Sequence, residues 1–215
     1  MVSAANDTFL TIRGPARAEL RILGSRFIAQ AFPVASRDAM SEALEAVRRT
    51  MHDATHHCFA YRLGREAPDA RSSDAGEPSG TAGRPLMAAL ERRELTDILL
   101  VVTRYFGGTK LGTGRLARAY GEAASVVLEA CERQEYIVHR RLAISLPHPL
   151  IGELLHQVAR VGGRIAGTTS EAVARYEVEV RLSRQEEFCM ALRERTGGAA
   201  RVVPGGVRAV PGSGA

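Results

Sequence analysis

The sequence predicts an α+β protein of two domains, residues 1–134 and 135–215. A chain of 215 residues with 45% hydrophobic content is long enough to bury more than one core. The run Ile98–Val102 is continuously apolar and rich in β-branched residues, which is typical of a strand buried on both faces. After residue 134, the order strand, helix, glycine pair, strand occurs twice and predicts a second, smaller sheet.

The first domain is expected to open with strands and a helix. Three short runs alternate apolar and polar side chains and predict strands: residues 9–12, 18–22 and 26–32. The first two flank Gly14 and Pro15, and this turn predicts that they pair with each other. Ser36 has the position of a helix N-cap, because apolar residues recur at helical spacing from Met40 to Met51.

The rest of the first domain alternates strands, helices and glycine-rich loops. Further strands are predicted at residues 58–63 and 98–105, and helices at residues 81–93 and 116–131. The residues from Gly64 to Gly80 are polar and rich in Pro, Gly and Ser, so we expect a long surface loop there.

The second domain has the outline of a ferredoxin-like βαββαβ fold. Strands are predicted at residues 136–146, 164–166, 173–182 and 201–203. One helix begins near Pro149 and ends at Gly162, and the other, residues 184–195, ends at Gly197 and Gly198. We expect residues 211–215 to form a loose tail.

Charge points weakly toward an acidic partner. The net charge of +5 and the isoelectric point near 9.5 favour nucleic acid or a ribosomal surface, although 24 acidic residues accompany 29 basic ones. Lys110 is the single lysine of the sequence. Because an ammonium group is more compact than a guanidinium, a tight phosphate or carboxylate site can require lysine, and we treat Lys110 as the most informative cation.

Cysteines and the N-terminus indicate a cytoplasmic protein. Cys58, Cys131 and Cys189 are odd in number and lack C-x-x-C spacing, which predicts neither disulfides nor a zinc site. The first residues resemble no signal peptide, and no apolar run reaches 18 residues, so we expect no membrane association. No motif predicts a metal or another cofactor, and nothing indicates DNA specificity.

Two glycine-rich loops that each lead into a predicted helix form a candidate anion site. Backbone N–H groups at such helix starts lack intrahelical partners and attract anions. The candidate anion or nucleic-acid contacts are Arg84, Arg104, Gly107, Gly108, Lys110, Gly112, Gly114, Arg115 and Arg118. For any single glycine, the simpler interpretation is that it permits a tight turn.

An enzyme is the competing interpretation. His56, Asp74 and Glu77 could provide acid–base groups for a phosphorylated or otherwise anionic small molecule. Lys110 does not follow the last glycine of its loop, so the loop is not a Walker A motif, and no serine lies in a nucleophile elbow. No catalytic residue is therefore assigned.

The motifs themselves resemble a known family. Ala54–Tyr61, Ser73–Pro85 and Arg104–Gly114, followed by Arg118–Tyr120, closely resemble the IMPACT family in its bacterial YigZ-type form. The resemblance covers about residues 17 to 130. The motif residues that form a candidate site are His56, Asp74, Gly76, Glu77, Ser79, Gly80, Thr81 and Tyr105.

The resemblance implies a fold and a role. It implies a first domain similar to domain IV of elongation factor G and a second domain similar to its domain V. Those domains contact ribosomal RNA, so the resemblance implies a translation-associated protein that binds RNA, the ribosome or a ribosomal partner. A protein-docking module is a further alternative. Two positions depart from the family pattern: Ala75 replaces a common acid, and Arg115 replaces a common glycine.

Overall fold

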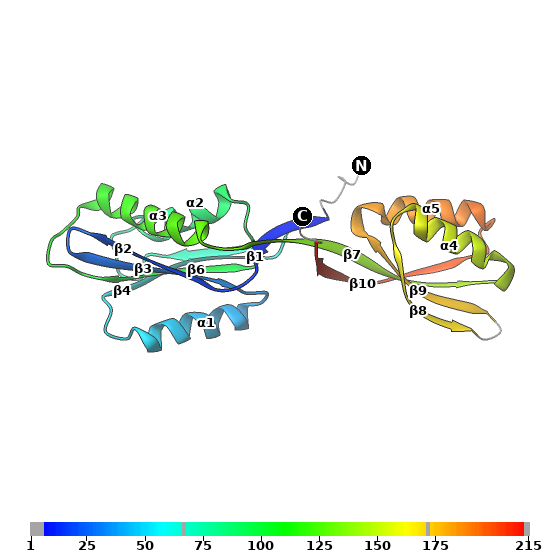
Figure 1. Ribbon diagram of the computed structural model, residues 1–215, viewed down its shortest axis with the longest axis horizontal. Coiled ribbons are helices and arrows are strands. Elements are labelled where there is room, and N and C mark those ends of the chain that lie inside the picture. Colours follow the sequence, from blue (N-terminus) through cyan, green and yellow to red (C-terminus); the bar gives the residue numbers. More distant parts are fainter. Residues whose placement is uncertain (1–6, 66–67, 171–172, 213–215) are drawn as a thin grey trace. The chain divides into compact units, whose positions relative to one another are not determined.

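The computed structural model describes residues 7–65, 68–170 and 173–212 (Figure 1). Contacts between these residues divide them into two compact units. The first unit is Phe9–Gln134, and the second begins at Glu135 and includes Asp7 and Thr8. Asp7 joins the second unit because its carbonyl accepts a hydrogen bond from the Val138 N–H at 2.6 Å.

The first unit contains a five-stranded antiparallel sheet. Its strands are β2 (Ala16–Ile22), β3 (Ser25–Pro33), β4 (His56–Leu63), β5 (Asp69–Ser73) and β6 (Ile98–Tyr105). They lie in the order β2-β3-β6-β4-β5, and each neighbouring pair is antiparallel. The central strand β6 is buried from Ile98 to Arg104, which confirms the expected strand with two covered faces.

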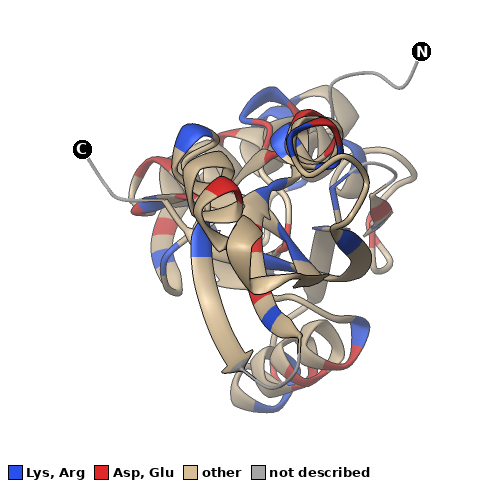
Figure 2. Cartoon of the chain, turned by 90° about the vertical axis from the view of Figure 1, so that its right-hand side faces the viewer, with Lys and Arg blue, Asp and Glu red and all other residues tan. Residues whose placement is uncertain are grey.

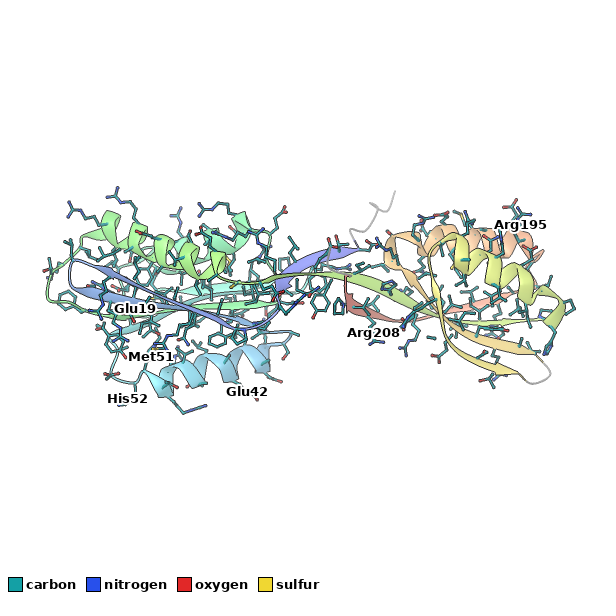
Figure 3. All side chains as sticks on the ribbon, in the orientation of Figure 1. Glu19, Glu42, Met51, His52, Arg195 and Arg208 are labelled. Carbon is teal, nitrogen blue, oxygen red and sulfur yellow. The ribbon has the colours of Figure 1, made fainter. Side chains whose placement is uncertain are left out.

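Three helices cover both faces of this sheet (Figure 1). Helices α2 (Gly83–Arg92) and α3 (Thr113–Glu129) lie on one face, and α1 (Arg37–Thr50) lies on the other. Successive residues of β6 point to opposite faces, so Leu100 packs with α2 and α3 while Leu99 packs with α1. The expected N-cap is confirmed, since Ser36 Oγ accepts a hydrogen bond from the Ala39 N–H at 3.2 Å. Glu42, labelled in Figure 3, lies on the exposed side of α1.

Two predictions for the first unit were wrong in detail. The first strand, β1 (Thr8–Ile12), does not pair with β2 but belongs to the second sheet. β2 instead pairs with β3, because Leu23 and Gly24 have φ angles of +46° and +81° and make the tight turn between them. The expected loop from Gly64 to Gly80 contains β5, a polar edge strand without apolar alternation; residues 66–67 lie outside the described residues.

The second unit places two helices on one face of an antiparallel sheet (Figure 1). Its strands are β7 (Arg133–Leu146), β8 (Arg164–Ser170), β9 (Ala174–Arg181) and β10 (Arg201–Pro211). Its helices are α4 (Ile151–Arg160) and α5 (Gln185–Arg195), each preceded by a short turn, η1 (His148–Leu150) or η2 (Leu182–Arg184). β7 pairs with both β9 and β10, β9 pairs with β8, and all these pairs are antiparallel.

The last strand is longer than predicted. β10 extends to Pro211 and keeps its pairing with β7 through a register shift between Pro204 and Val207. Pro204, Gly205 and Gly206 interrupt the alternation in the sequence, and a bulge absorbs this interruption. Of the expected tail, Pro211 therefore lies in a strand, and residues 213–215 lie outside the described residues.

Candidate functional site

The first glycine-rich loop is closed by its own carboxylate. Asp74 Oδ1 accepts hydrogen bonds from the N–H groups of Ala82 at 2.9 Å and Gly83 at 2.8 Å, and Oδ2 accepts from Gly80 at 2.8 Å. Burial raises the pKa of Asp74, but these three backbone donors outweigh it and hold the pKa below its ordinary value. The N-terminus of α2 is thus already occupied by an anion from the same chain.

The other motif residues of this loop shape its turns. Gly76 and Gly80 have φ angles of +91° and +76°. The Thr81 hydroxyl donates to the Pro78 carbonyl at 2.6 Å, and Ser79 is exposed. A Cβ atom at Gly83 would lie 3.0 Å from the backbone nitrogen of Ser73, which explains a glycine there.

Beneath this loop lies a buried ion pair. Glu77 Oε1 accepts from Arg104 Nη1 at 2.8 Å and from the Tyr120 hydroxyl at 2.7 Å. Arg104 also donates to Ser25 Oγ at 3.2 Å, and only 5% of its surface is exposed. Arg104 therefore ties β6 to the loop from within the unit and presents no free guanidinium to solvent, unlike the other arginines of the predicted site.

His56 lies at the edge of this ion pair. His56 Nδ1 is 2.9 Å from the Ala75 carbonyl oxygen, and Nε2 is 3.8 Å from Glu77 Oε2. A Cβ atom at Gly76 would come within 3.2 Å of the imidazole, so the histidine packs directly on the turn. His57 points elsewhere, to the Thr103 hydroxyl at 3.1 Å, and burial lowers its pKa.

Tyr120, which donates to Glu77, and its neighbour Cys58 were not predicted as site residues from the sequence. The Tyr120 hydroxyl lies 3.3 Å from Cys58 Sγ, and both side chains are buried. Burial raises the pKa of Tyr120, and it raises that of Cys58 to about 12, so both groups are neutral at physiological pH. A hydroxyl within the apolar stripe of α3 was the available signal, because a buried tyrosine oxygen requires a partner.

Asp74, Glu77 and His56 are thus engaged with the protein itself. The carboxylate of Asp74 faces α2, whereas that of Glu77 faces Arg104 and Tyr120. Within the described residues, no group of three or more His, Cys, Asp or Glu side chains could hold a metal ion. The contacts explain these three residues as parts that fix the loop.

The second glycine-rich loop, residues 107–115, is mostly exposed to solvent, unlike the first. Gly107–Lys110 and Gly112–Arg115 are exposed. α3 begins after Gly112, which has a φ angle of +74° and provides no side-chain cap, and the first turn of α3 carries no acid. The N–H groups at the start of this 17-residue helix are therefore exposed, and no carboxylate of the described residues caps them.

Close backbone packing fixes the start of this loop. A Cβ atom at Gly107 would lie 1.9 Å from the backbone carbon of Gly24 and 2.2 Å from the nitrogen of Ser25. The Gly107 N–H also donates to Ser25 Oγ at 3.2 Å. Tyr105, the last residue of β6, donates its hydroxyl to Asp53 at 2.9 Å. These contacts hold the loop against β3 and the segment after α1.

Four of the predicted cations are exposed: Lys110, Arg115 and Arg118 in the second loop and the first turns of α3, and Arg84 in the first turn of α2. Within the described part of the chain, none of the four forms an ion pair. Helices α2 and α3 approach closely where Pro85 lies near Gly121, and the Arg84 side chain lies beside Gly80 of the first loop. In the view of Figure 2, both basic and acidic residues occur along the ribbon.

Comparisons with known proteins identify relatives of this chain. The Impact N-terminal domain family model matches residues 23–128. The IMPACT family member YvyE of Bacillus subtilis is 35% identical over 151 residues, which are 70% of each chain. The IMPACT family member YigZ of Escherichia coli is 29% identical over 201 residues, or 92% of this chain and 98% of that one.

A solved structure covers almost the whole chain. The crystal structure of a hypothetical protein is similar with a TM-score of 0.65 and 28% identity, over 92% of this chain and 97% of that one. In the described residues, no helix has the length and apolar character needed to cross a membrane. Both units thus have counterparts among known proteins.

Proposed function

The chain belongs to the IMPACT family, and from this membership and the geometry of the second loop we propose that it binds RNA, as a translation-associated protein. The bound RNA is either free or part of a ribosomal surface. The proposal rests on the start of α3, which has no side-chain cap, together with Lys110, Arg115 and Arg118, exposed cations that form no ion pair with the described residues. Phosphate oxygens satisfy outward-facing N–H groups and cations together.

The roles of the residues follow from their exposure. Lys110, Arg115, Arg118 and Arg84 contact phosphates, and the exposed glycines Gly107, Gly108, Gly112 and Gly114 let the RNA backbone approach closely. Arg104 and the first loop support this surface from within the unit. An enzyme is less well supported, because His56, Asp74 and Glu77 have protein partners.

The fold is consistent with a translation-factor likeness. We propose that the unit from residue 9 to residue 134 resembles domain IV of elongation factor G and that the unit after it resembles domain V. The strand order β10-β7-β9-β8, with α4 and α5 on one face, supports a ferredoxin-like second domain. This likeness concerns the fold alone. The proposed function rests on the residues of the second loop and the start of α3.

The test measures RNA affinity over a salt series. Fluorescence anisotropy with a 20-nucleotide single-stranded RNA, and co-sedimentation with bacterial ribosomes, would compare the wild type with Lys110→Ala and Arg115→Ala. Each lost phosphate contact should reduce the slope of log K against log salt by about 0.7. Arg49→Ala, an exposed change on α1 at the opposite face, is the matched control. Absence of wild-type binding to both RNA and ribosomes at 50 mM salt would refute the proposal.

A further inference from the structure

The sheet of the second unit has one face covered by helices and one face without them. Even-numbered residues of β7 and β9, such as Leu142, Ile144 and Val178, pack with Leu154 of α4 and Phe188 of α5. Residues between them must point to the opposite side, because side chains alternate along a strand. We call this opposite side of β7, β8, β9 and β10 the open sheet face.

Arginine dominates the open sheet face. The strand register aligns its residues in rows across the sheet: Arg201, Ser145, Arg175 and Thr169; Arg141, Glu179 and Arg164; Arg208, His139 and Arg181. Glu177 lies between the first two rows, paired with Ala143 and Gly167. These three rows and Glu177 together hold six arginines against two glutamates.

One of those glutamates is already neutralised. Glu179 is 1% exposed and accepts from Arg141 Nη2 at 3.1 Å and Arg164 Nε at 2.8 Å. Burial raises the pKa of Glu179, but these arginines outweigh it and keep the carboxylate ionised. The side chains of Arg141 and Arg164 remain 46% and 63% exposed, so the pair holds two cations in place at the surface.

The helical side of the same unit differs. α4 and α5 carry three arginines and four glutamates: Arg160, Arg193 and Arg195, with Glu153, Glu186, Glu187 and Glu194. Figure 3 labels Arg208 on β10, which belongs to the open face, and Arg195 on α5. Arg140 and Arg184 also lie on the helical side, where they contact Gln185 and Glu187 of α5, so the arginines there are nearly balanced by glutamates and the larger net positive charge is on the open sheet face.

We infer that the open sheet face binds the phosphate backbone of single-stranded RNA, as a second surface in addition to the α3 site. Arginine forks match phosphate oxygens in pairs, and the small residues Ala143, Ser145 and Gly167 leave room for a strand between them. His139 is the single aromatic ring among the described residues of these rows, too few to read successive bases, so binding depends little on base sequence. Among the described residues of this face, Val203 is an exposed large apolar side chain while Ile137 and Val210 are half-buried, too little to anchor a membrane. The choice of RNA among polyanions rests on the proposed function.

The experiment compares two charge-matched variants of the full chain. Arg175→Gln with Arg201→Gln removes from the face two exposed cations that form no ion pair with the described residues, and Arg193→Gln with Arg195→Gln removes two exposed cations from α5. With 20-nucleotide oligo(U) and a mixed-sequence RNA at 0.1 M salt, we expect the first pair to weaken binding roughly 20-fold and to lower the salt slope by about 1.4. We expect the α5 pair to change affinity less than about 3-fold, because its charges are not on the path of the RNA.

Each outcome decides between the surfaces. Equal effects of the two pairs, or a strong preference for one RNA sequence, would overturn the inference. Loss of binding in the Lys110 and Arg115 variants with no change in the sheet pair would leave the proposed function standing and reject the second surface. The reverse result would support the second surface and reject the α3 site. Binding to phosphatidylserine vesicles but not to RNA would reject RNA as its ligand.

Discussion

Replacing Asp74 by alanine should destabilise the first unit more than any change at an exposed acid. The substitution removes a carboxylate that accepts three backbone hydrogen bonds. A hydrogen bond to a charged group contributes about 1.5–3 kcal/mol, and loss of a helix cap costs about 1–2 kcal/mol. Gly80 is partly exposed and can bind water, whereas Ala82 and Gly83 are buried. Because the three bonds share one acceptor, we expect a total cost of about 3–4 kcal/mol.

Residue-resolved amide hydrogen exchange measures this cost. The free energy of opening for amides of α2 should fall by the full amount, while amides of α5 in the other unit provide an internal reference. Asp74→Asn retains one acceptor oxygen, so it should cost less, about 1–2 kcal/mol. Asp38→Ala, an exposed acid in the first turn of α1, should cost below about 1 kcal/mol.

The effect of pH has a defined sign. The folded state lowers the pKa of Asp74, so its stabilising contribution is complete above the unfolded pKa of about 4. The contribution is lost as pH falls through the folded pKa. The gap between wild type and Asp74→Ala should therefore shrink between pH 5 and pH 2. A cost below about 1 kcal/mol at pH 7, or a gap that does not change with pH, would refute the reasoning.

Three further predictions concern the ion pair, the second loop and the thiols. Gly107→Ala should prevent native packing of the second loop, because its Cβ would overlap the backbone of Gly24. Gly114→Ala should be neutral or stabilising by up to about 1 kcal/mol, because a Cβ there would meet no atom within 4 Å. Thermal unfolding of both variants measures the difference. Glu77→Gln should cost about 3 kcal/mol in urea unfolding, because it leaves the buried charge of Arg104 uncompensated, and a cost near zero would contradict this account. At pH 8 a thiol reagent should modify Cys58 last of the three cysteines, since its pKa is raised to about 12 and it is fully buried. In urea all three cysteines should react. Early labelling of Cys58 in mass spectra of the folded protein would be inconsistent with this.

Strand and helix positions followed from the sequence where burial was strong. The apolar run of β6 and the capped start of α1 predicted those elements because their side chains pack locally and periodically. β5 was missed because an exposed edge strand has no apolar face to reveal it. The pairing of β1 was mispredicted because strand partners depend on contacts far apart in the sequence.

For the candidate site too, the sequence predicted residue types but not their contacts. The sequence showed the residue types of the two glycine-rich loops and their cations. It did not show that Asp74 closes the first loop while the second loop is exposed. Asp74 and Glu77 lie three residues apart in the sequence, yet one caps α2 and the other binds Arg104, which comes from β6. Contacts between residues far apart in the sequence decide which partner within the protein each of these carboxylates binds. The open sheet face was equally hidden, because its arginines come from four strands and no short motif connects them.

The exposure of Lys110 has a practical consequence. Since it is the single lysine of these 215 residues, it offers their one side-chain amine to an acylating reagent. Within these residues a lysine-specific protease would likewise have one cleavage site, in the exposed second loop. Modification or cleavage at this position therefore reports occupancy of the loop by any bound molecule, in the unaltered protein and without an engineered label.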